Sequence, residues 1–194
     1  MPPLSLEWFK HSLILMVFGV SVAQADIQIR SLNDYQMDQQ LVIDAHVDFA
    51  LEPLIIEAVN HEVPLTFVTE IELNETYSLM GIHLSRNRVK IVYESQLNYF
   101  GFHKNYVISN KRNQKVQSLS SLSDALKTMG TLSNFYIANL ADLHPNTLYT
   151  IKIRVSLNKW KLPTPLILDA LWNPAWQLDS GWHQIQIQSP KSWQ

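Results

Sequence analysis

The chain contains no cysteine, so it forms no internal disulfide and performs no thiol chemistry. Glycine is scarce, with five residues in 194, and none lies in a phosphate-binding loop or in the G-x-S-x-G turn of serine hydrolases. Charged residues make up only 16% of the chain and the formal net charge is −2, which argues against a chain-wide basic surface for nucleic acid. With no catalytic motif to support one, we predict that the protein is not an enzyme and has no cofactor.

An apolar run of signal-peptide length occupies residues 12–22. Lys10 and His11 precede this run, and Ala23 and Ala25 follow it as the small residues that signal peptidase accepts. We therefore expect residues 1–25 to be a Sec-type signal peptide and residues 26–194 to be one β-rich domain. The alternative is an uncleaved signal anchor. Export without disulfides favours the bacterial periplasm, with membrane contact only through an uncleaved signal segment.

Alternation of apolar and polar residues predicts many strands. It is strongest at residues 41–49 and 149–157 and recurs at 26–34, 65–73, 88–94, 102–109, 134–140 and 183–188. Two short helices are expected, one after Pro53 and one over residues 120–130 with Ser121 as its cap. Residues 74–85 and 159–178 are expected to be irregular. Because most strands follow one another without a helix between them, we predict an antiparallel β-sandwich, immunoglobulin-like in general architecture.

Four segments in a particular order resemble a known family. They are residues 63–73 (VPLTFVTEIEL), residues 121–126 (SLSDAL), the 149–157 strand followed by LPTPL at 162–166, and residues 180–187 (SGWHQIQI). In this order they resemble DUF4390, a proteobacterial family of exported proteins of unknown function. The resemblance implies a signal peptide, a β-rich exported domain and a membrane sensor kinase of the nitrogen-regulation type encoded nearby. It implies no catalytic residues.

Metal binding has one candidate site. Asp44, His46 and Asp48 alternate along one strand face, where they could ligate a divalent ion from the solvent side of a sheet. A solvated strand face explains the same pattern, and further ligands at a recognisable spacing are missing from the sequence. We therefore predict no metal site.

Tryptophan is concentrated near the C-terminus, among several prolines. Trp160, Trp172 and Trp176 are candidate partner-binding residues, because rigid aromatic side chains dominate many interfaces. The alternative is that these side chains close one end of the sandwich, since tryptophan is highly buried on average.

The leading functional hypothesis is a non-enzymatic periplasmic module that binds an envelope or membrane protein, with a sensor kinase as one candidate partner. A second hypothesis is a periplasmic hydrolase or small-ligand-binding protein whose site is assembled from scattered residues. A third is an envelope-structural protein.

Overall fold

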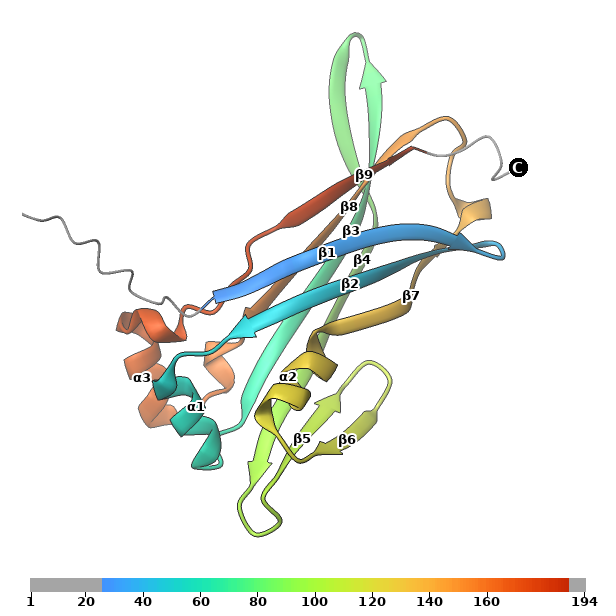
Figure 1. The fold of residues 1–194 in the computed structure, drawn as a ribbon. Helices are drawn as coiled ribbons and strands as arrows, with labels where there is room; N and C mark the ends of the chain where they lie inside the picture. Colours follow the sequence, from blue (N-terminus) through green and yellow to red (C-terminus); the bar gives the residue numbers. More distant parts are fainter. Residues whose placement is uncertain (1–25, 189–194) are drawn as a thin grey trace, which may run out of the picture.

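The computed structural model describes residues 26–188, and two antiparallel sheets account for most of them (Figure 1). The expected signal peptide lies outside the described residues. The three-stranded sheet has the order β1-β2-β7 and the six-stranded sheet the order β6-β5-β4-β3-β8-β9. This arrangement confirms the prediction of a mainly β, antiparallel fold. The strands are β1 (Asp26–Met37), β2 (Gln40–Ala50), β3 (Leu65–Leu79), β4 (Ile82–Phe100), β5 (Asn105–Asn110), β6 (Lys115–Leu119), β7 (Thr131–Asn139), β8 (Leu148–Leu157) and β9 (His183–Gln188).

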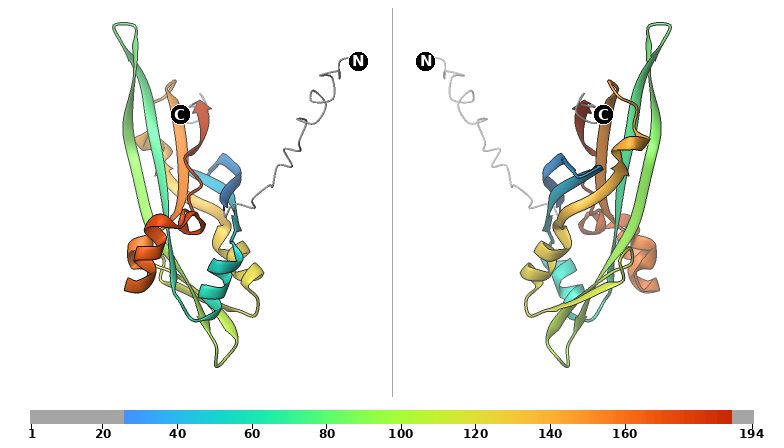
Figure 2. Two further views of the ribbon diagram at one scale, coloured as in Figure 1. Left: turned by 90° about the vertical axis from the view of Figure 1, so that its left-hand side faces the viewer. Right: turned by 90° about the vertical axis from the view of Figure 1, so that its right-hand side faces the viewer.

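The smaller sheet covers one face of the larger sheet, and the core lies between them (Figure 2). Leu41 and Ile43 of β2 belong to the same buried cluster as Leu73 of β3 and Ile151 of β8. A second cluster includes Phe67, whose ring makes an edge-to-face contact with Phe49 at 5.1 Å between centroids. The alternation of apolar residues therefore correctly identifies the buried faces of the strands.

Three helices pack around one end of the two sheets: α1 (Pro53–Asn60), α2 (Leu122–Gly130) and α3 (Thr164–Trp172). Ser121 caps α2 as expected, since its Oγ accepts a hydrogen bond from the Asp124 N–H at 3.1 Å. The third helix corrects the expectation of two helices and an irregular segment. Its prolines, Pro163 and Pro165, lie at the start of the helix, where a missing N–H removes no intrahelical hydrogen bond. Within residues 26–188, no helix is both long and apolar enough to span a membrane.

Strands β3 and β4 form a long hairpin that projects beyond the rest of the six-stranded sheet (Figures 1 and 2). The expectation of an irregular segment at residues 74–85 is therefore wrong. Met80 and Gly81 form the turn with positive φ angles of 52° and 81°, a conformation that suits a tight hairpin. Strand β8 pairs with β3 only as far as Thr76. Beyond this residue, the tip of the β3–β4 hairpin keeps its strand conformation through hydrogen bonds between β3 and β4 alone.

Candidate functional site

Two of the three candidate tryptophans lie on the surface of the domain. Trp160, in the short 3-10 helix η2 (Lys159–Lys161), is 72% exposed, and Trp172, at the end of α3, is 86% exposed. Leu168 and Leu171 are also exposed, and both lie on α3. We call these four residues the α3 surface.

The composition of α3 explains why this surface is unusual. The helix buries Ala170 and packs Leu166 and Ile167 against the core. A helix at a protein surface normally carries polar residues on its outer face, whereas Leu168, Leu171 and Trp172 present apolar side chains to solvent. Apolar groups gathered at one surface mark interaction sites more often than single exposed residues do.

Trp176 has a different role, because it is buried in the core. It lies in the 3-10 helix η3 (Pro174–Trp176) and is 1% exposed. Its indole N–H donates a hydrogen bond of 2.8 Å to the Asp169 carboxylate. The expectation that tryptophan closes one end of the sandwich therefore describes Trp176, while Trp160 and Trp172 remain available to a partner.

The carboxylates of the candidate metal site are engaged with neighbouring protein groups. Asp44 accepts hydrogen bonds from the Tyr35 hydroxyl at 3.1 Å and from the Asn134 N–H at 2.8 Å. Asp48 forms an ion pair with Arg30 at 2.6 Å, and the hydrogen bond from Arg30 lowers the pKa of Asp48. In the described part of the chain, no group of three or more metal-ligating side chains could hold an ion. Asp44 instead fixes an irregularity in β7, where Asn134 has a φ angle of 51°.

A buried carboxylate and a histidine form a pair that the sequence did not reveal. Glu75 is buried, and its Oε1 lies 2.6 Å from Nδ1 of His144, which is 69 residues away in the chain. The Arg88 guanidinium lies 3.7 Å from the other carboxylate oxygen. Such a pair resembles the base and its orienting acid in a hydrolase. Among the serine hydroxyls of residues 26–188, those of Ser121 and Ser180 hydrogen-bond to Asp124 and to the Gly181 carbonyl and not to a histidine.

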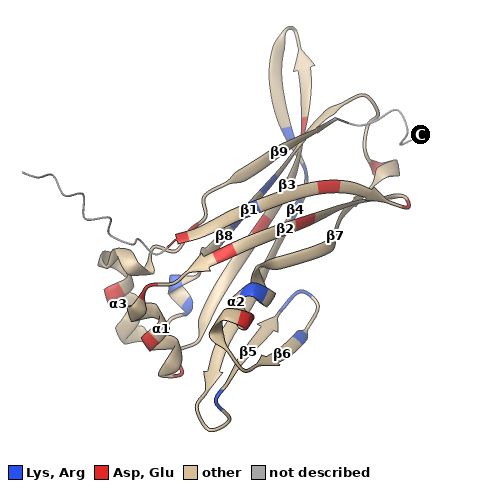
Figure 3. Cartoon of the chain, in the orientation of Figure 1, with Lys and Arg blue, Asp and Glu red and all other residues tan. Residues whose placement is uncertain are grey.

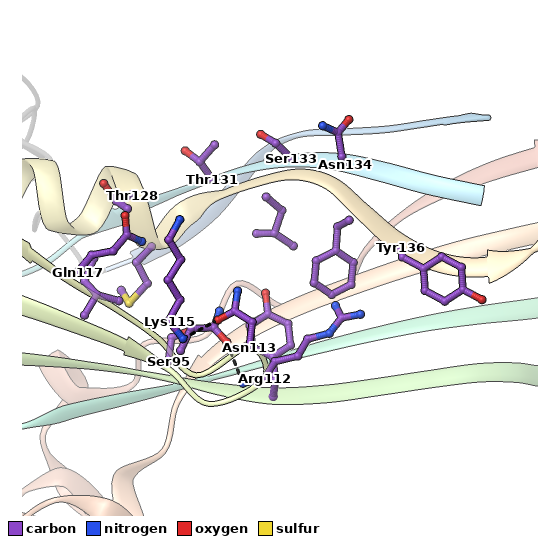
Figure 4. A pocket seen from close by; sticks show the side chains of 16 residues that line it. Ser95, Arg112, Asn113, Lys115, Gln117, Thr128, Thr131, Ser133, Asn134 and Tyr136 are labelled. Carbon is purple, nitrogen blue, oxygen red and sulfur yellow. Dashed lines mark hydrogen bonds between the residues drawn. The ribbon is translucent and has the colours of Figure 1, made fainter. Parts of the chain in front are cut away.

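A groove of about 470 Å³ lies between β7 and the β5–β6 hairpin (Figure 4). The hairpin side contributes Arg112 and Lys115, and the guanidinium of Arg112 lies over the Phe135 ring of β7, 3.8 Å from its centroid. No acidic residue lines the groove. Figure 3 shows the hairpin carrying basic residues only. The charged side chains that line the groove are therefore all basic. No sequence motif predicted the groove, because its sides come from two different sheets.

Comparison with protein families finds one match. The model described as a domain of unknown function, DUF4390, matches residues 24–186. No curated protein and no solved structure matches the chain.

Proposed function

Because the chain belongs to the DUF4390 family, whose description assigns no activity, we propose a function from its own surfaces: a non-enzymatic, periplasmic protein-binding module. The partner is an envelope or membrane protein, with the extracytoplasmic part of a sensor kinase as one candidate.

The α3 surface is the observation that carries this proposal. Trp160 and Trp172 present two largely exposed indoles. Leu168 and Leu171 add exposed apolar side chains on α3, which contacts η2. Tryptophan is one of the residue types enriched among interface residues whose truncation is costly. Burying these side chains against a partner would remove apolar area from water, at about 25 cal/mol for each Å².

The position of this surface supports a partner at the membrane. Asp26, at the start of β1, pairs with Ala50, which lies three residues before α1, so the chain enters the domain at the end of the sheets where the helices pack (Figure 1). The apolar run at residues 12–22 precedes this entry point. During export, or with an uncleaved anchor, the helical end of the domain, which carries the α3 surface, would therefore face the bilayer and proteins embedded in it.

Crosslinking in cells tests the proposal. A photoreactive amino acid at position 168 should capture an envelope protein, whereas the same probe at Lys152, on the solvent face of β8, should capture none. Trp172→Ala and Trp160→Ala should each weaken capture at least tenfold without lowering the melting temperature. Trp176→Ala is the control for structural loss, because it removes a core side chain and should lower the melting temperature. Undiminished capture by the folded Trp160 and Trp172 variants would contradict the proposal.

A further inference from the structure

The groove between β7 and the β5–β6 hairpin is bordered by a strand edge. In its sheet, β7 pairs with β2 along one side, and along the other side it has no strand partner among residues 26–188. Six consecutive residues of β7, 131–136, line the groove. Since successive side chains of a strand point to opposite faces, a consecutive run means that the strand borders the groove with its backbone as well as its side chains.

Figure 4 shows the same arrangement in the side chains. Those of Thr131, Ser133 and Asn134 point away from Arg112 and Lys115, which occupy the opposite side of the groove. These three residues therefore contribute mainly backbone to the groove. Backbone N–H and C=O groups along an open strand edge are the groups that accept a further strand.

Among the described residues, the two basic side chains opposite this edge have no carboxylate partner. Of the three basic residues in the β5–β6 hairpin, Lys111 forms an ion pair with Glu94 at 3.1 Å. Within residues 26–188, neither Arg112 nor Lys115 has a carboxylate within ion-pair distance. Stacking on Phe135 occupies one face of the Arg112 guanidinium, so its in-plane N–H groups remain suited to a carboxylate.

We propose that this groove binds an extended, acidic peptide segment of a partner protein, which adds as a strand to the free edge of β7. Backbone hydrogen bonds to β7 would hold the segment, as in other cases of strand addition. Arg112 and Lys115 would select a segment with a carboxylate facing the hairpin. Residues 131–136 form this edge, and the irregularity at Asn134 divides it into two short stretches of strand. This interaction is separate from the α3 surface and uses none of its residues.

Peptide binding to the purified protein tests the proposal. The probe is a fluorescent nine-residue peptide, the length of β7, with alternating valine and threonine and a central aspartate. Binding is followed by fluorescence anisotropy. The double variant R112Q/K115Q should bind this peptide at least tenfold more weakly than the native protein. Lys104→Gln is the matched control, because Lys104 is exposed in the turn between β4 and β5 and does not line the groove. A peptide with asparagine in place of aspartate should bind the native protein more weakly and lose little further affinity with the double variant.

Methylation of the peptide backbone separates strand addition from simple charge attraction. N-methyl groups on alternate residues block the N–H groups along one edge of the peptide only. One of the two alternately methylated peptides should lose binding and the other should retain it. Equal binding of both would overturn the proposal, and acetate or inorganic phosphate displacing the peptide at millimolar concentration would identify a small-anion site instead. Failure of the aspartate peptide to bind would also reject the proposal. So would sedimentation showing that the protein forms a dimer, if formation of that dimer abolishes peptide binding.

Discussion

Gly130 is the position at which helix α2 touches the backbone of strand β2. A Cβ atom added there would lie 2.0 Å from the carbonyl oxygen of Val47 and 3.0 Å from its carbonyl carbon. It would also lie 3.2 Å from the Phe49 ring. The glycine, which is the last residue of the helix, is therefore required by the close approach of two backbones.

Two effects of Gly130→Ala oppose each other, and their sizes decide the outcome. In a helix, replacing glycine by alanine favours folding by about 1 kcal/mol. Against this, α2 and β2 would have to separate by at least about 1 Å, in an interior packed as densely as an organic crystal. Because β2 is hydrogen-bonded on both sides, to β1 and β7, it cannot move independently. Overpacking against side chains typically costs 1 to 3 kcal/mol, so against backbone we expect about 3 kcal/mol or more.

Urea denaturation of Gly130→Ala should therefore show a net loss of at least about 2 kcal/mol in the free energy of unfolding. Gly81→Ala is the control, because Gly81 has a φ of 81° and a Cβ there would have no atom within 4 Å. That variant should lose about 1 kcal/mol from backbone strain alone. If Gly130→Ala is as stable as the native protein, the helix does not approach the strand so closely and the reasoning fails.

Three further predictions concern the core, one ion pair and the N-terminus. Phe67→Ala should cost about 3 to 5 kcal/mol, whereas Phe102→Ala, at a site 93% exposed, should change the melting temperature little; equal losses would refute the assignment of the buried face. The hydrogen bond from Arg154 lowers the pKa of Asp179 in the folded protein. The interaction between these two side chains therefore stabilises the fold fully above the unfolded pKa of Asp179, about 3.9, and this stabilisation is lost as the pH falls through the lower folded pKa. The difference in melting temperature between native protein and Asp179→Asn should thus shrink below about pH 4, and a constant difference down to pH 2 would refute it. Mass spectrometry of the exported protein should find Asp26 as the first residue, and an intact Met1 would show that the signal segment is retained.

Features that depend on neighbours in the chain were readable in the sequence. The alternation at residues 41–49 and 149–157 identified the buried faces of β2 and β8, because a strand with one buried face carries an apolar side chain at every second position. The cap of α2 was likewise local, since Ser121 and Asp124 are three residues apart. The tip of the β3–β4 hairpin was missed because its alternating runs are short: Tyr77 and Leu79 on one arm and Ile82 and Leu84 on the other, separated by Met80 and Gly81. All four of these apolar side chains are exposed, so no buried face extends the pattern, and backbone pairing between β3 and β4 maintains the strands.

What only the tertiary structure decided is which residues meet and which remain in solvent. Composition could not distinguish Trp172 from Trp176, because both are near prolines and differ only in how α3 packs on the core. Glu75 and His144 are 69 residues apart, and Arg112 reaches Phe135 from a different sheet. Contacts of this kind follow from how whole sheets pack together. No local pattern of residues encodes them. For that reason the groove, and the exposure of Trp160 and Trp172 as against Trp176, became visible only in the folded molecule.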